Sequence, residues 1–329
     1  MSIVIIVVDS TTTLVSLLDN LIGLAADPPS LYLDLEGVKL GRHGSISIIS
    51  LYIPPIKKIY LIDIHRLGKT AFSITNSSAT SLKTILESPT IPKVIFDIRN
   101  DSDALFSHFQ ISVNGIKDLQ LMELATRKGS KDFVVGLAKC VEKESPISAA
   151  AKADWQSTKE SATRLYDPRK GGRYEIFNER PMKPEIIQYS AWDVALLPGL
   201  YSVYNAKLCL PGEAFWQAHV REATKDRIKL SQSPGYDGQA KSNVRGPWDK
   251  WDIERAIEAW NEDVLHNALM GDEDIEQDTN AWNDDDMLNA LTGDNGDEDY
   301  DGYDDNFFSE SARDCMDWEE DMIKNGEYF

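Results

Sequence analysis

The chain has 329 residues, of which 42% are hydrophobic, so it can form one large domain or two ordinary domains with a sizeable core. No apolar run approaches the ~20 residues of a membrane-spanning helix, and no basic segment precedes the apolar run at 3–8, so we expect neither a membrane span nor a secretory signal. Its three widely spaced cysteines match neither a disulfide framework nor a zinc site. We therefore expect an intracellular protein, cytoplasmic or nuclear.

The formal net charge of −20 is concentrated at one end of the chain. Residues 251–329 hold 27 of the 54 acidic residues and 3 of the 34 basic ones, so this tail carries about −24 and residues 1–250 about +4. A mildly basic body can bind a polyanion, whereas the acidic tail is expected to be disordered alone.

The tail contains a repeat with a period of 22 residues, 259–272 against 281–294. Its Trp, Leu and Met residues favour docking on a protein partner, on a second copy or on the body. The alternative is duplicated linker sequence without a function.

Strand-like and helix-like segments alternate through the first two hundred residues. The strand-like segments are short apolar runs, and they lie at 3–8, 31–37, 45–53, 58–64 and 93–98. The helix-like segments lie at 81–86, 101–109, 133–141 and 185–204. Three consecutive antiparallel strands followed by strand and helix alternation predict an α/β fold with a mixed sheet flanked by helices. Pro198 is expected to kink or end the last helix.

The segments beyond these elements are more polar. Residues 142–182 are polar and basic, with a turn at Gly171–Gly172, and no dense core pattern follows Pro211. We therefore divide the chain into a domain at 1–210, a basic extension at 211–250 and the acidic tail at 251–329. The extension includes Arg221, Lys225, Arg227, Lys229 and Trp248.

Asp34 and Glu36 form the first candidate pair for a site. They lie two residues apart on a predicted strand, so their side chains emerge from one face and can share a metal ion. A solvated strand face or a salt bridge explains the pair alone equally well. Leu31, Leu33 and Leu35 predict a buried strand, however, and carboxylates placed there need cations to offset their desolvation and repulsion.

Three more residues have side chains suited to such a site. Asp101 follows the strand at 93–98 and enters a helix, where an Asp is usually only a cap. Tyr189 and Asp193 lie four apart on the last helix, which places the phenol and the carboxylate on one face. A tyrosine on a helix is more often core packing.

The order of these elements resembles the tyrosine-containing branch of the DEDD exonucleases, to which ribonuclease D and the Werner-type exonuclease domain belong. The shared pattern is D-x-E on a first strand, Asp after a later strand, and Y-x-x-x-D on a closing helix. It covers about residues 25–205 and includes the stretches LDLEG, VIFDIRNDSDALFSHF and RPMKPEIIQYSAWDVALL. The sister branch has a histidine five residues before its last Asp, whereas this chain has none between His108 and His219. Spacing to Phe109 favours Asp101 over Asp103.

The resemblance implies a ribonuclease H-like fold at 1–210 and a 3′-5′ exonuclease that releases nucleoside 5′-monophosphates from RNA or DNA with a free 3′ end. It also implies two Mg²⁺ or Mn²⁺ ions with four carboxylate ligands, Asp34, Glu36, Asp101 and Asp193. Asp34 would bridge the two ions. Tyr189 would orient the attacking water. The alternative is a catalytically inactive module that binds nucleic acid or protein on the same fold.

A second candidate for nucleic-acid binding is the stretch 166–174. Its basic residues are Arg169, Lys170 and Arg173, and with Tyr166 and Tyr174 they could contact phosphates or stack on bases. An exposed charged turn is the alternative.

Two other motifs fail on spacing. Gly68-Lys69-Thr70 resembles the end of a phosphate-binding loop, but Asp63 stands where the first glycine is required, so we expect a turn. Residues 297–302 begin like a calcium loop, but Phe308 stands where a bidentate Glu is needed.

Overall fold

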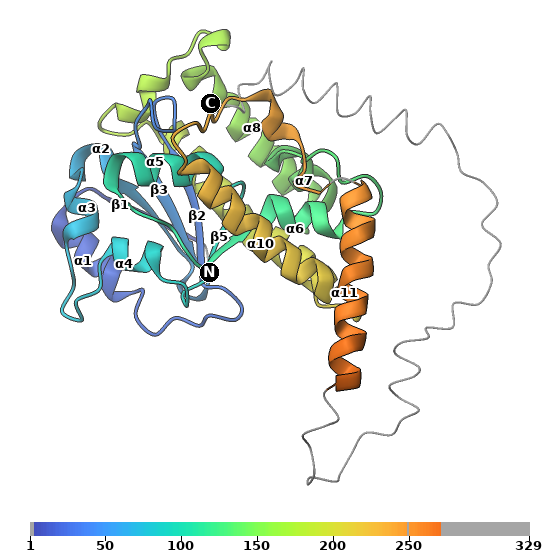
Figure 1. Ribbon diagram of the computed structural model, residues 1–329. Coiled ribbons are helices and arrows are strands. Elements are labelled where there is room, and N and C mark those ends of the chain that lie inside the picture. The colour runs from blue at the N-terminus through green and yellow to red at the C-terminus, as the bar shows by residue number, and fades with distance from the viewer. Residues whose placement is uncertain (1–2, 249, 271–329) are drawn as a thin grey trace. The chain divides into compact units, whose positions relative to one another are not determined.

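The computed structural model describes residues 3–248 and 250–270, and the chain divides into two compact units with a boundary between Lys250 and Trp251 (Figure 1). The first unit holds a six-stranded sheet in the order β1-β4-β3-β2-β5-β6. The strands are β1 (Val4–Val8), β2 (Leu31–Glu36), β3 (Ile48–Ile53), β4 (Lys58–Asp63), β5 (Lys93–Ile95) and β6 (Ile116–Asp118). The β2–β3 and β3–β4 pairs are antiparallel, and the other pairs are parallel. The predicted mixed sheet with three consecutive antiparallel strands is confirmed.

Helices flank this sheet. Those of the first unit are α1 (Thr11–Asp19), α2 (Ile64–Leu67), α3 (Thr70–Ser73), α4 (Leu82–Glu87), α5 (Arg99–Phe109), α6 (Leu119–Thr126), α7 (Leu137–Glu144), α8 (Ala149–Tyr166), α9 (Pro184–Leu208) and α10 (Ala214–Ser231). Ser10 and Ser81 start α1 and α4 with reciprocal caps, because each serine hydroxyl accepts from the N–H of a Thr three residues later and that Thr accepts in return.

The two faces of β2 have different surroundings. The apolar face consists of Leu31, Leu33 and Leu35. These side chains belong to the main hydrophobic cluster, which also contains side chains of α1, α4 and α5. Because side chains alternate along a strand, Tyr32, Asp34 and Glu36 point to the opposite face. There α9 packs across β2, β3 and β4, and Tyr32 meets Tyr201 of α9 edge to face. The alternation therefore directs both acids of β2 toward α9.

Helix α9 continues through Pro198 to Leu208, so of the two predicted effects, a kink or an end, Pro198 does not end the helix. Pro184 occupies the first turn, where its missing N–H costs nothing. Beyond Pro198 the helix still buries Leu200 and Tyr204 completely, and this burial offsets the hydrogen bond that an internal proline removes.

Two polar segments form helices that the sequence did not indicate. Residues 142–182 contain α8, and residues 211–250 contain α10, which packs on α5, α6 and β6. Arg227, counted among the basic residues of the extension, is only 6% exposed. It forms an ion pair in the interior and so contributes no charge to a basic surface.

The remaining expectations concern turns and the tail. Gly68-Lys69-Thr70 joins α2 to α3 as a turn, with Gly68 at a φ of 54°. In the second unit, α11 (Lys250–Met270) covers the start of the acidic tail and most of the first repeat. The second repeat and the calcium-like motif at 297–302 lie outside the described residues.

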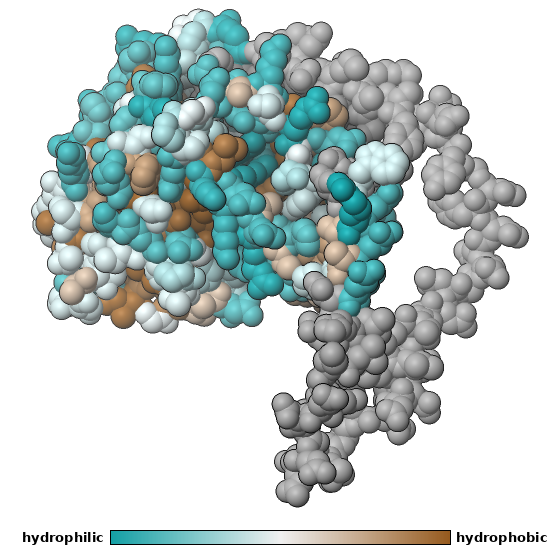
Figure 2. Space-filling model, viewed as in Figure 1, coloured by the Kyte–Doolittle hydropathy of each residue, from teal (hydrophilic) through white to brown (hydrophobic). Residues whose placement is uncertain are grey.

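Hydrophilic residues predominate on the face shown in Figure 2, where hydrophobic residues are exposed in small groups. No helix within residues 3–248 and 250–270 is long and apolar enough to cross a membrane.

Candidate active site

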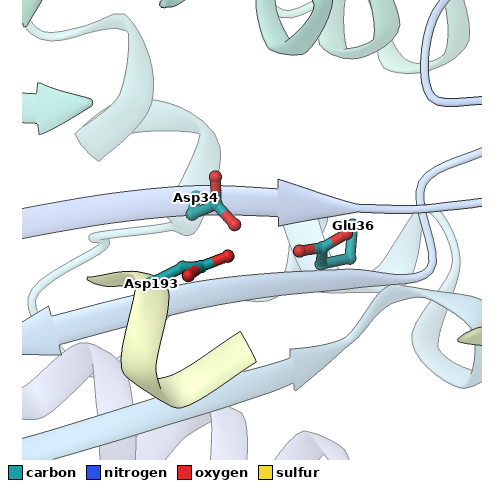
Figure 3. Close-up of side chains that lie close together, drawn as sticks. All are labelled: Asp34, Glu36 and Asp193. Carbon is teal, nitrogen blue, oxygen red and sulfur yellow. The ribbon is translucent and has the colours of Figure 1, made fainter. Parts of the chain in front are cut away.

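Three elements bring the five predicted site residues to one pocket of about 210 Å³. Asp34 and Glu36 come from β2, Asp101 from the first turn of α5, and Tyr189 and Asp193 from successive turns of α9. Carboxylate oxygens of Asp34, Glu36 and Asp193 lie within 4.8 Å of one another, and Figure 3 shows the three side chains pointing toward one another. Asp101 lines the same pocket from α5.

Burial and mutual repulsion disfavour the ionised form of these carboxylates. Burial, followed by the charge of Asp193, raises the pKa of Asp34 to about 8. Burial, followed by the charge of Asp34, raises the pKa values of Glu36 and Asp101 well above their usual range. A bound cation would reverse this preference. Carboxylate oxygens this close together suit a hard divalent ion, so the residues fit Mg²⁺ or Mn²⁺.

Tyr189 lies beside the acids as a neutral hydroxyl. Its phenol lies close enough to Glu36 to counter part of the rise in the pKa of that carboxyl, and its ring is tilted against Tyr166 with the ring centroids 5.5 Å apart. Burial, followed by the charge of Glu36, raises the pKa of Tyr189 well above its usual value. The side chain therefore keeps its proton at neutral pH and can orient a water molecule but not act as a strong base.

Helix α8 forms a wall of the pocket that the sequence analysis missed. The Trp155 indole Nε1 donates to Asp193 Oδ1 at 3.2 Å. Lys159, one turn later, lines the pocket, and its charge opposes part of the rise in the pKa of Asp34 that burial and Asp193 cause. A stripe of Trp, Lys and Tyr at helical spacing was the available signal, but the surrounding residues are too polar to indicate a buried helix.

The loop between β5 and α5 holds a second group of charges at the edge of the pocket. Asp97 has a left-handed φ of 59° and accepts two hydrogen bonds from the guanidinium of Arg99, at 2.7 and 2.5 Å. Burial alone would raise the pKa of Asp97, but the charges of Arg99 and Arg227 hold it well below its usual range. No motif in the sequence indicates this group of charges.

The predicted basic stretch 166–174 is largely engaged with neighbouring acids. Arg169 donates to Asp167 at 3.1 and 3.0 Å, and Arg173 pairs with Glu179. Tyr166 and Tyr174 line the pocket itself. Lys170 instead lines a neighbouring groove of about 710 Å³, together with Arg164, Trp155 and Lys159.

Asp103, the alternative to Asp101, points away from the pocket. It accepts hydrogen bonds from the backbone and side chain of Arg42, at 2.7 and 2.8 Å. The structure thus brings Asp101, and not Asp103, to the other acids.

A family model described as 3′-5′ exonuclease matches residues 10–208. The chain belongs to this family. This match confirms the resemblance to the tyrosine-containing DEDD exonucleases that the motifs indicate. The mouse (Mus musculus) piRNA biogenesis protein EXD1 is 35% identical over 89 residues, which are 27% of this chain and 14% of that protein.

Solved structures support the same fold. Ribonuclease D of Trypanosoma brucei in complex with RNA U12 has a TM-score of 0.59 and 18% identity, with 77% of this chain and 78% of that chain covered. The GMP complex of the same enzyme has a TM-score of 0.59 and 17% identity, with 78% and 72% covered. At such identities the similarity concerns the fold, and it confirms the predicted fold class.

Proposed function

We propose that this protein is a divalent-cation-dependent 3′-5′ exonuclease that hydrolyses nucleic acid and releases nucleoside 5′-monophosphates. The observation that carries the proposal is the cluster of Asp34, Glu36 and Asp193, with Asp101 in the same pocket. Buried acids that repel one another lower the stability of the fold unless a cation offsets their charge. An inert binding module would have no reason to keep such a cluster of acids.

The proposed ligands of two Mg²⁺ or Mn²⁺ ions are Asp34, Glu36, Asp101 and Asp193. When bound, such ions activate the attacking water and stabilise the leaving 3′ oxygen. Tyr189 would contribute a hydrogen bond that orients this water, because its hydroxyl is protonated and lies beside Glu36. Trp155 would hold Asp193 through its indole N–H.

The groove next to the pocket supports a path for the rest of the strand. Lys159 lines both the pocket and the groove, so its ammonium can contact a phosphate near the cleaved bond. Lys170 and Arg164 line the groove further along and can contact backbone phosphates. Arg169 and Arg173 remain weaker proposals, because each is already paired with an acid.

We further propose a regulatory or partner-docking role for the acidic tail at 251–329.

The proposal is tested with matched RNA and DNA oligonucleotides carrying a 5′ label, in Mn²⁺ and in EDTA. We expect a ladder that shortens from the 3′ end only with Mn²⁺, no cleavage when the 3′ end is blocked, and no cleavage by Asp34→Asn. Equal cleavage of circular and linear strands would overturn the exonuclease assignment. Binding without any cleavage by the wild-type protein would favour the alternative of an inactive binding module.

A further inference from the structure

We infer that the segment 227–243, which lies beyond the family match at 10–208, positions Asp101 in the pocket. The inference rests on the proposed function, in which Asp101 is a cation ligand. The segment begins in the last turns of α10, Asp101 is located in α5, and the two helices are in contact, with one end of α10 next to α5 in Figure 1.

Arg227 fixes the start of α5 through Asp118. Its Nη1 donates to Asp118 Oδ2 at 2.9 Å and lies 3.5 Å from Asp97 Oδ1. Asp118 in turn accepts hydrogen bonds from the backbone N–H groups of Asp97 and Ile98, at 3.2 and 3.3 Å. The side chain of Ile98 cannot cap α5, and Asp118, which also caps α6, instead fixes the backbone that leads into α5. The helix that carries Asp101 therefore starts where Arg227 and Asp118 hold it.

The two residues before Asp101 are held by the same segment. The Tyr236 hydroxyl donates to Asn100 Oδ1 at 2.9 Å. Arg99 Nη1 donates to the Asn243 carbonyl at 2.7 Å. Asn100 lines the pocket, so the contact with Tyr236 lies at the edge of the site.

The two residues after Asp101 are held as well. The Ser231 hydroxyl donates to the Ser102 hydroxyl at 2.9 Å. Asp103 binds the Arg42 guanidinium, which also donates to the Ser231 carbonyl at 2.8 Å. All four neighbours of Asp101 in the sequence are thus connected to the segment 227–243, directly or through Arg42.

These contacts are poorly suited to a purely stabilising role. Arg227 Nη2 is buried without a hydrogen-bond partner among the described residues, and such an ion pair adds little stability compared with apolar residues in its place, although removal of one partner alone is costly. Asp97 holds a left-handed conformation that costs free energy in a residue other than glycine. Both features are explained if the ion pairs serve to fix the conformation of the loop that leads into Asp101.

The test uses variants of the full chain in two matched pairs. Arg227→Met breaks the buried ion pair with Asp118, and Arg127→Met breaks a more exposed pair with Glu123 that does not line the pocket. Gly238→Ala places a Cβ 2.3 Å from Asn100 Oδ1, whereas the same change at Gly235 meets open space. The glycine pair changes no charge and keeps the test valid if the arginine variant fails to fold.

We expect Arg227→Met to weaken Mn²⁺ binding about 10- to 100-fold, the range typical of groups that hold metal ligands in place. Gly238→Ala should weaken it in the same direction, with a lower kcat and a nearly unchanged KM. Both controls should stay within about twofold of the wild type. The acidic tail is present in every variant, so its own Mn²⁺ binding cancels in the comparison.

Hydrogen exchange of the metal-free protein separates this inference from the proposed function. Faster exchange of the amides at 97–103 in Gly238→Ala, and not in Gly235→Ala, supports the positioning role even if the wild type cleaves nothing. Wild-type protein that neither binds Mn²⁺ in the pocket nor cleaves overturns the proposed function alone. Equal Mn²⁺ affinity and equal exchange in Gly238→Ala and its control overturn the positioning of Asp101.

Discussion

Replacing Tyr189 with Phe removes one hydroxyl from the pocket and leaves the ring against Tyr166. In the proposed mechanism that hydroxyl orients the attacking water, and a hydrogen bond to a group that carries charge contributes about 1.5–3 kcal/mol. Since 1.36 kcal/mol corresponds to a factor of ten in rate, we expect single-turnover cleavage to slow about 10- to 150-fold. Substrate affinity should change little, because an oriented water contributes mainly in the transition state.

The assay is rapid-quench cleavage of a 5′-labelled oligonucleotide with enzyme in excess. The matched control is Tyr201→Phe on the same helix, which removes a hydroxyl that donates to Asn205 at 3.2 Å. The control should cleave at the wild-type rate. An unchanged rate constant for Tyr189→Phe would show that the tyrosine only packs against Tyr166, and the proposed role in orienting water would be wrong.

Three further outcomes are expected. Asp34→Asn should abolish turnover and most of the stabilisation that Mn²⁺ binding gives the folded protein. In the wild type this stabilisation is about 2.7 kcal/mol when the Mn²⁺ concentration is 100 times the Kd, and thermal melting with and without Mn²⁺ measures it. Lys159→Met should raise KM about tenfold or more, because the variant loses a charged contact with a phosphate. Lys152→Met is the control on the same helix, since Lys152 Nζ donates to the Glu142 carbonyl, and steady-state kinetics should show no change in its KM. Burial lowers the pKa of Lys93 to about 7, below its value in the unfolded chain, so the unfolded state binds more protons between pH 7 and 10. The free energy of unfolding should therefore rise with pH in the wild type relative to Lys93→Met, by up to about 1.4 kcal/mol per unit, and urea titrations at pH 7 and 9 measure it.

The parts of the site that the sequence predicts are those that local periodicity determines. Asp34 and Glu36 share a face because side chains alternate on a strand, and Tyr189 and Asp193 share a face because they are one helical turn apart. Each relation holds within a few residues and can be read without knowing the fold. The resemblance to the DEDD exonucleases then supplies what periodicity cannot, namely that the strand, α5 and α9 meet at one pocket.

The parts that the sequence does not predict depend on contacts between distant segments. Lys159 reaches the pocket only because α8 packs on α9, and the polar composition of α8 obscures the weak stripe of Trp, Lys and Tyr that marks its buried face. Arg227 looks like one of several surface bases in its segment. It is buried because Asp118 and Asp97, more than a hundred residues earlier, provide charges to pair with it.

The family match ends at residue 208, but the compact unit that holds the pocket extends to Lys250. Relatives define a family by the positions that they share, whereas burial defines a folding unit. A chain ending at residue 208 would lose Arg227 and leave Asp118, which is completely buried, without its charge partner. Removing one partner of a buried pair costs about 3–5 kcal/mol, a large share of the about 5–15 kcal/mol that stabilises a typical domain. We therefore expect a chain of residues 1–208 to melt at a much lower temperature than residues 1–250, or to fail to fold cooperatively. Equal melting temperatures for the two truncated chains would show that the family domain is a complete folding unit and that the segment after it is dispensable for stability.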